Sequence, residues 1–285
     1  MSDDIAPAGP VGSAGAGVAD RAAPGRASSA DELVIAGLVP LSTCDWPDHL
    51  VATAFLQGCP WDCTYCHNPD LIDPRRAGTV AWSQVRELLD RRQGRLDGVV
   101  FSGGEPTRQA GLADAMRDVR ARGFAVGLHT SGAYPRRLRE LLPLVDWVGI
   151  DIKAPRGRYA AITGVAASED LAFASLRLVL DAGVAVQVRT TVDPTSLDED
   201  DVADLSATLR AMGVRDHVLQ EMRTTGVRPQ YLAALRRTAA RTPPAPRRAD
   251  PDPAAPALPS AEALPPAEAL PPAEAPPSAD DEGLR

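Results

Sequence analysis

The sequence lacks any apolar run close to the roughly 20 residues that a membrane-spanning helix requires. Its first ten residues carry acids where an export signal would carry basic residues, so we expect no signal peptide, no membrane partner and a cytoplasmic location. An excess of positive charge is also missing, because 38 acidic residues outnumber 30 basic ones and the net charge is −8. Such a chain offers no general attraction to a phosphate backbone, so we predict no nucleic-acid partner.

The remaining composition is that of an ordinary globular protein. The chain has 285 residues, 44% hydrophobic and 24% charged, which suits one large domain or two small ones. Proline is unevenly placed, since 13 of the 27 prolines fall in residues 243–285, within a six-residue repeat of Pro, Ala and Glu. That segment cannot bury a core. We predict a disordered leader over 1–30, a folded domain over 31–242, and a disordered tail that serves as a solvating segment or, alternatively, as a docking arm.

Within residues 31–242, apolar runs of strand length alternate with amphipathic runs of helix length, a pattern that predicts parallel strands joined by crossover helices. The predicted strands cover residues 50–57, 98–102, 125–129, 147–152, 184–191 and 217–221. The predicted helices cover residues 82–92, 108–122, 135–142, 168–182, 197–212 and 229–240. Six such repeats fit either an incomplete barrel or a doubly wound sheet. In both folds, ligands bind at the carboxyl ends of the strands.

Cysteine is scarce and clustered, because Cys44, Cys59, Cys63 and Cys66 are the four cysteines of the chain. Disulfides are not expected without an export signal. The last three are spaced C-x3-C-x2-C directly after the first predicted strand, and clustered thiols on such a loop indicate a metal. Three thiolates can hold three corners of a four-iron cluster, whereas such clusters are commonly held by four cysteines. The vacant iron suggests that a substrate or cofactor binds the metal directly.

Other interpretations of the cysteines exist. Zinc could be bound by three of them, with Cys44 or His67 completing a tetrahedron. Residues 63–67 also fit the C-x-x-C-H string of haem attachment, although that modification belongs to exported proteins. Reduced thiols without any ligand would not explain three cysteines within eight residues. The sequence beyond the cysteines separates these possibilities.

The segment 37–71, GLVPLSTCDWPDHLVATAFLQGCPWDCTYCHNPDL, resembles radical S-adenosylmethionine enzymes of the glycyl-radical enzyme activating type. The similarity extends over residues 34–223 and is greatest to the anaerobic ribonucleoside-triphosphate reductase activating proteins, with the pyruvate formate-lyase activating enzymes more distant. The resemblance implies an α/β fold, a partial (β/α)6 barrel of the radical SAM type. It also implies a [4Fe-4S] cluster held by Cys59, Cys63 and Cys66, with S-adenosylmethionine bound at the fourth iron.

The same resemblance implies a set of contacts to S-adenosylmethionine at successive strand ends. The residues concerned are Tyr65, Gly103, Gly104, Glu105, Thr130, Ser131, Asp151, Lys153 and Arg189. The two glycines let a backbone approach a ligand closely, and Glu105 is expected to contact the methionyl amino group. Alternation along a strand places Asp151 and Lys153 on one face. Arg189 lies within an apolar strand, so we expect it to have a partner and to bind the methionyl carboxylate in a bidentate manner. Tyr65 is expected near the adenine.

The chemistry implied by the resemblance belongs to the cofactors. A reduced cluster transfers an electron to S-adenosylmethionine, which is cleaved to methionine and a 5′-deoxyadenosyl radical that abstracts hydrogen. The expected acceptor is a backbone glycine of a glycyl-radical enzyme, anaerobic ribonucleotide reductase first of all. The expected electron donor is a flavodoxin or a ferredoxin. Two alternatives are a radical SAM enzyme that acts on a small molecule or peptide, and a zinc-stabilised binding protein.

The sequence also departs from its relatives at particular positions. Formate-lyase activators carry an acid, part of a cation site, where this chain has His129 directly before Thr130. No second cysteine cluster accompanies the first, which argues against activating enzymes with a ferredoxin-like insert. Cys44 is not a standard cluster ligand, and we expect it to be a buried thiol or a replaced small residue rather than a redox or metal participant. For His49 and His217 we expect structural roles.

Overall fold

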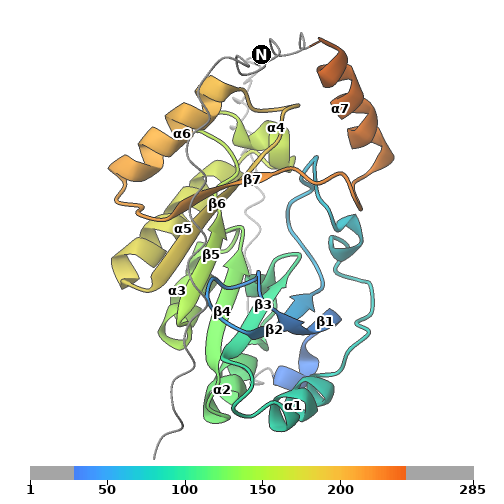
Figure 1. The fold of residues 1–285 in the computed structure, drawn as a ribbon, viewed down its shortest axis with the longest axis vertical. Helices are drawn as coiled ribbons and strands as arrows, with labels where there is room; N and C mark the ends of the chain where they lie inside the picture. Colours follow the sequence, from blue (N-terminus) through green and yellow to red (C-terminus); the bar gives the residue numbers. More distant parts are fainter. Residues whose placement is uncertain (1–28, 242–285) are drawn as a thin grey trace, which may run out of the picture. The chain divides into compact units, whose positions relative to one another are not determined.

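The computed structural model describes residues 29–241, and the folded part is one seven-stranded sheet flanked by helices (Figure 1). The predicted tail and nearly all of the predicted leader lie outside the described residues. The strands are β1 (Ile35–Ser42), β2 (Val51–Leu56), β3 (Gly98–Gly103), β4 (Ala125–Thr130), β5 (Trp147–Asp151), β6 (Ala185–Val192) and β7 (His217–Glu221). The helices are α1 (Trp82–Arg91), α2 (Leu112–Ala121), α3 (Pro135–Leu141), α4 (Tyr159–Thr163), α5 (Ser168–Ala182), α6 (Glu199–Ala211) and α7 (Pro229–Arg241).

The strands lie side by side in chain order from β1 to β7, with β1 antiparallel to β2 and every later pair parallel. A doubly wound sheet would reverse its strand order partway across. The continuous order is that of a barrel wound in one direction, so the predicted partial (β/α)6 barrel is confirmed. In the part of the chain that the structure describes, no helix is long and apolar enough to cross a membrane.

All six predicted strands are present. Each of β2 to β5 contains a run of buried residues, whereas β6 buries only Val188 and Thr190 and β7 buries none. The first strand, β1, was not predicted. It is an edge strand that exposes residues 39–41 and includes Pro40, which an edge position tolerates because an outward N–H is not needed there. Its apolar pattern is therefore interrupted. The five-residue helix α4 was also not predicted, and α2 begins later than expected because a 3-10 turn, η3 (Pro106–Arg108), precedes it.

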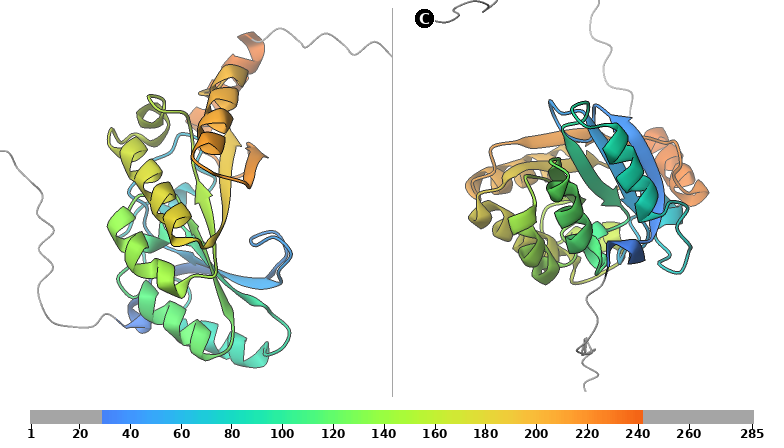
Figure 2. Two further views of the ribbon diagram at one scale, coloured as in Figure 1. Left: turned by 90° about the vertical axis from the view of Figure 1, so that its left-hand side faces the viewer. Right: turned by 90° about the horizontal axis from the view of Figure 1, so that it is seen from below.

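The two faces of the sheet are covered by different groups of residues. Crossover helices pack on the outer face (Figure 2), where the large core cluster lies. On the inner face, Trp46 from the β1–β2 connection packs with Val51, Val100 and Trp147 at the amino ends of the strands. Trp46 stacks on Trp147 at a centroid distance of 5.5 Å. This plug closes the amino end of the barrel, and the inner face at the carboxyl ends is left for polar residues.

Candidate cofactor site

A cavity of about 650 Å³ lies on the inner face at the carboxyl ends of the strands. Eleven of the twelve site residues predicted from the sequence line it, and the exception is Glu105. These eleven are Cys59, Cys63, Tyr65, Cys66, Gly103, Gly104, Thr130, Ser131, Asp151, Lys153 and Arg189. The size is in the range of about 300–1,000 Å³ that is usual for cofactor pockets. Residues far apart in sequence are thus brought together, and their roles as ligands stay predictions.

The cysteines are carried by residues 58–67, which we call the cysteine loop. It begins where β2 ends, and Gly58 makes the turn with a φ of +97° that favours glycine. Short α4 supports the loop from one side, because Asp62 N donates to Thr163 O and Thr64 N donates to Ile162 O, both at 3.0 Å. The loop is therefore fixed by backbone hydrogen bonds although it has no helix or strand of its own.

Two of the thiols, those of Cys59 and Cys63, are favoured in their protonated form by their surroundings. Burial raises the pKa of Cys59 to about 12 and also raises the pKa of Cys63, while the charge of Lys153 opposes both shifts. A metal that takes thiolate ligands would therefore release protons as it binds. Within residues 29–241, no three His, Cys, Asp or Glu side chains converge closely enough to hold a single metal ion. The cysteines instead line the wall of the larger cavity.

Three buried polar atoms of the cysteine loop have no hydrogen-bond partner, namely Thr64 Oγ1, Tyr65 Oη and His67 Nε2. A buried polar group without a partner destabilises a fold by about 1–3 kcal/mol. Tyr65 and His67 both line the cavity. A bound polar molecule would supply the missing partners, so a cluster on the thiols and a nucleoside beside Tyr65 fit the residues that are present.

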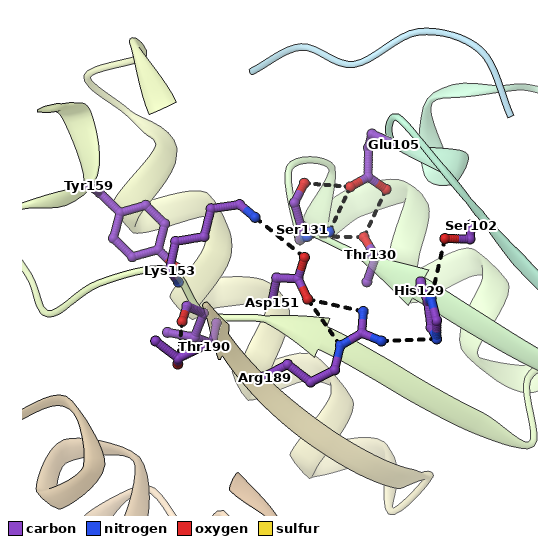
Figure 3. Close-up of polar contacts among 12 residues, drawn as sticks. Ser102, Glu105, His129, Thr130, Ser131, Asp151, Lys153, Tyr159, Arg189 and Thr190 are labelled. Carbon is purple, nitrogen blue, oxygen red and sulfur yellow. Dashed lines mark hydrogen bonds and ion pairs between the residues drawn. The ribbon is translucent and has the colours of Figure 1, made fainter. Parts of the chain in front are cut away.

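Glu105 lies behind the cavity wall with no exposed surface. Its Oε1 accepts hydrogen bonds from Thr107 N at 3.1 Å, Thr107 Oγ1 at 2.6 Å and Thr130 Oγ1 at 2.8 Å. Its Oε2 accepts from Ser131 N at 2.8 Å and Ser131 Oγ at 2.5 Å (Figure 3). Direct contact with a methionyl amino group stays a prediction. What the carboxylate does here is fix Thr130 and Ser131 at the end of β4.

Gly103 and Gly104 serve the protein backbone as well as the cavity. A Cβ on Gly103 would lie 2.3 Å from Leu56 N and O, and one on Gly104 would lie 2.6 Å from Gly58 O. The φ of Gly103 is +125°, which other residues rarely adopt. Both glycines allow β3 to approach β2 and the cysteine loop closely, and their approach to a ligand stays a prediction. From the sequence alone, a glycine that allows two backbone segments to pack closely cannot be distinguished from a glycine that allows a ligand to approach.

The charged residues of the site form one group (Figure 3). Arg189 donates from Nε and Nη2 to Asp151 Oδ1, at 3.1 Å and 3.0 Å, and Lys153 Nζ lies 3.4 Å from Asp151 Oδ2. Arg189 therefore has the partner that its place in an apolar strand requires. Burial raises the pKa of Asp151, but the charges of Lys153 and Arg189 outweigh that effect and hold it below its ordinary value. The two cations leave the group with a net positive charge facing the cavity.

His129 is a cavity residue that was not predicted as part of the site. Its Nε2 lies 2.6 Å from Asp45 O, and its Nδ1 lies 3.2 Å from Ser102 Oγ. Burial and the charge of Arg189 lower the pKa of His129 to about 4, so the ring is neutral. The sequence feature that could have placed His129 in the cavity is its position on β4, two residues after Gly127 and therefore on the same face of the strand.

The prediction of a buried thiol at Cys44 was wrong, since this residue is exposed. It lies at the cavity wall, with its Sγ 3.5 Å from Ser42 Oγ, in a connection that carries few apolar residues to cover it. Residues 220–223, at the end of β7, also line the cavity and were not predicted. No motif marks them, because their place depends on how the barrel curves back toward the cysteine loop.

Comparison with known proteins assigns the family. A family profile of the radical SAM superfamily matches residues 53–209, more than half of the chain. A putative glycyl-radical enzyme activating enzyme of Methanocaldococcus jannaschii is 31% identical over 187 residues, covering 62% of this chain and 75% of that protein. A pyruvate formate-lyase-activating enzyme of Staphylococcus aureus is 31% identical over 188 residues, covering 60% of this chain and 73% of that protein.

A solved structure with the same fold is SuiB of Streptococcus suis bound to S-adenosylmethionine, with a TM-score of 0.50 at 15% identity. The match covers 65% of this chain and 44% of that one, so this chain spans less than half of SuiB. Enzymes of the radical SAM superfamily use a [4Fe-4S] cluster and S-adenosylmethionine, the two cofactors predicted from the sequence. The chain belongs to the radical SAM superfamily and, within it, to the glycyl-radical enzyme activating enzymes.

Proposed function

We propose that Cys59, Cys63 and Cys66 hold the [4Fe-4S] cluster of this enzyme, and that its partner is an anaerobic ribonucleoside-triphosphate reductase. The observation that carries the proposal is one cavity, which gathers these thiols and the charged group of Asp151, Lys153 and Arg189. When bound and reduced, the cluster supplies the electron that cleaves S-adenosylmethionine to a radical able to abstract hydrogen. We further propose a cytoplasmic reaction with a flavodoxin or ferredoxin as electron donor.

The chain's own residues would bind and orient the S-adenosylmethionine. The methionyl carboxylate is attracted by the net positive charge around Asp151, where Lys153 is the cation with a single long contact to the acid at 3.4 Å. Most of the Arg189 fork is engaged by Asp151, so we assign carboxylate binding chiefly to Lys153. The Ser131 hydroxyl at the cavity wall is held by Glu105. Tyr65 is buried beside Lys153, whose Nζ lies 5.8 Å from the ring centroid.

Exclusion of water is the second task of the cavity. Lys153 is only 9% exposed, and Cys63 is equally buried. Charged groups interact strongly in such a place, and a reactive radical is protected from solvent and from side reactions. The cavity supports this role because its wall combines the buried thiol loop with the polar ends of β4 and β5.

His129 favours the reductase over the lyase as the partner. Formate-lyase activators place a cation-binding acid at this position, whereas His129 is neutral and buried and has Arg189 Nη1 3.0 Å from its Nε2. A cation is disfavoured beside that guanidinium. Pyruvate formate-lyase is the second candidate partner, supported by relatives of this chain that bear the name pyruvate formate-lyase-activating enzyme.

Reconstitution under anaerobic conditions tests the proposal. With iron and sulfide the protein should become brown, and with reductant and S-adenosylmethionine it should release 5′-deoxyadenosine. Cys63→Ala should abolish that release, whereas Cys44→Ala should retain it. Electron paramagnetic resonance should then show a glycyl radical on anaerobic ribonucleotide reductase. A colourless, zinc-loaded protein would refute the cluster, and a radical formed only on pyruvate formate-lyase would refute the choice of partner.

A further inference from the structure

The segment that joins β7 to α7, residues 222–228, lies against the cysteine loop, and we call it the C-terminal strap. Met222 and Arg223 line the cavity together with the cysteines. The radical SAM match ends at residue 209, so the strap is outside the segment matched to the superfamily. No motif of the sequence marks it, and none of its residues has a role in the proposed binding of the cluster or of S-adenosylmethionine.

The backbone of the strap approaches the cysteine loop at Gly226. A Cβ at this position would lie 2.4 Å from His67 O, a backbone atom directly after Cys66. Its φ is +83°, a conformation that side chains other than glycine rarely adopt. The strap backbone therefore packs directly on the cysteine loop, and only a residue without a side chain allows this approach.

His67 receives a second contact from the strap. Its ring lies beside the backbone of Arg223, while its Nε2 is buried without a partner. His67 lines the cavity. The strap thus engages the imidazole on one side and leaves the other ring nitrogen for a group bound in the cavity.

Arg228 makes the third contact. Its Nη2 pairs with Asp62 Oδ1, and its Nη1 lies 3.5 Å from Cys63 O. Both acceptors belong to the cysteine loop and precede His67 in the sequence. The Asp62 side chain is 66% exposed, so this ion pair is screened by solvent and stabilises the contact only weakly.

The strap is itself anchored to the barrel. Val227 is buried, and Tyr231 at the start of α7 donates a 2.5 Å hydrogen bond to Asp193, which is fully buried after β6. Asp193 also accepts from Thr195 and Ser196, so its position is fixed. A segment fixed at both ends can hold the cysteine loop in place.

We propose that the C-terminal strap positions the cysteine loop for its cofactors, with Gly226 as the principal positioning residue. The inference rests on the proposed function, because it takes Cys59, Cys63 and Cys66 as the cluster ligands. Loss of the contact should let the loop move, so that a bound cluster loses iron faster and S-adenosylmethionine binds more weakly. The overall fold should be affected much less.

Gly226→Ala tests the proposal against a matched control, Gly213→Ala. Gly213 has a φ of +94°, and a Cβ placed on it would meet no atom within 4 Å, so its alanine has the same backbone strain without the contact. After anaerobic reconstitution, iron transfer to a chelator and the Kd for S-adenosylmethionine are measured, together with Tm. We expect Gly226→Ala to lose iron about tenfold faster than Gly213→Ala, a typical size for a change next to metal ligands.

Equal rates of iron loss and equal Kd values in the two alanine variants would overturn the proposal. Arg228→Gln gives a second measurement should Gly226→Ala fold poorly, with exposed Arg215→Gln as its control. It should accelerate iron loss in the same direction but less, because its ion pair is solvent-exposed. An unchanged rate in Arg228→Gln alongside a disrupted Gly226→Ala would also count against the strap. Failure of the unaltered protein to bind a cluster would instead refute the proposed function.

Discussion

Arg189 donates two hydrogen bonds to a single oxygen of Asp151, from Nε at 3.1 Å and from Nη2 at 3.0 Å. The other oxygen of Asp151 faces Lys153 at 3.4 Å. One carboxylate therefore holds two cations on the inner face of the barrel, at the end of β5 and opposite it on β6. This relationship orders the charged half of the cofactor cavity before any ligand is bound.

Removal of the Asp151 charge should destabilise the protein. In Asp151→Asn, Lys153 and Arg189 would repel each other without an anion between them. We expect the free energy of unfolding to fall by about 2 kcal/mol, below the 3–5 kcal/mol of a fully buried pair because Asp151 is 34% exposed. Urea unfolding measures the change, with exposed Asp204→Asn on α6 as the control. A loss no larger than that of the control would contradict the assigned role.

Glu105→Gln should weaken S-adenosylmethionine binding although Glu105 does not line the cavity. An amide has only one acceptor oxygen, so one side of the network that fixes Thr130 and Ser131 is lost and a buried donor is left unpaired. We expect a loss of about 2 kcal/mol in stability and a raised Kd, measured by calorimetry on the reconstituted protein. Thr107→Val, which removes a bond on the side away from Ser131, should change stability but not Kd. Equal Kd values in all three proteins would exclude the indirect role.

Because the pKa of His129 is lowered in the folded protein, we expect its stability to depend on pH. Its pKa is lowered from 6.5 to about 4 by burial and by Arg189, so the unfolded chain binds this proton more readily. The contribution of His129 is therefore complete above pH 6.5 and is lost as the pH falls toward 4. At pH 5 the loss should be about 2 kcal/mol relative to pH 7, from 1.36 kcal/mol per pH unit.

Urea unfolding at pH 7 and pH 5 measures this dependence. His129→Gln, which does not titrate, should be less stable at pH 7 but lose less stability between the two pH values. The same slope in both proteins would show that other groups cause the acid sensitivity.

A substitution at Gly127 tests how much the plug at the amino end of the barrel contributes to the stability of the protein. A Cβ on Gly127 would lie 2.8 Å from Trp46 Cε3 and 2.9 Å from Val100 Cγ2. Gly127→Ala should therefore destabilise the protein by about 1–3 kcal/mol, as overpacking of a core does. Gly37→Ala on β1, where a side chain meets nothing within 4 Å, is the control. Thermal unfolding distinguishes the two, and recovery of stability in Trp46→Phe/Gly127→Ala would confirm the clash.

Much of the fold could be predicted because four of its strands, β2 to β5, contain runs of buried apolar residues. Residues 98–102 and 147–152 are examples, because the observed strands β3 and β5 begin at the first residue of each predicted range. β1 was not predictable, because Pro40 and the exposed residues around it remove the alternation of a half-buried strand. Its place depends on pairing with β2, which is a tertiary contact.

The site was predictable where a motif stands at a strand end. The cysteine spacing and the charged pair of β5 identified residues that do meet in the cavity. The role of Glu105 depends on which way its side chain turns, and the sequence does not contain that information. Arg228 looks like any surface arginine until the strap brings it to Asp62, 166 positions away.

In the proposed site, three cysteines hold the cluster and leave one iron free for S-adenosylmethionine. Mössbauer spectroscopy of protein reconstituted with 57Fe tests it most directly, because a ligand change alters the spectrum of the iron that it binds. We predict that S-adenosylmethionine changes one iron of the cluster and leaves the others unchanged. A spectrum that is identical with and without S-adenosylmethionine would contradict the claim.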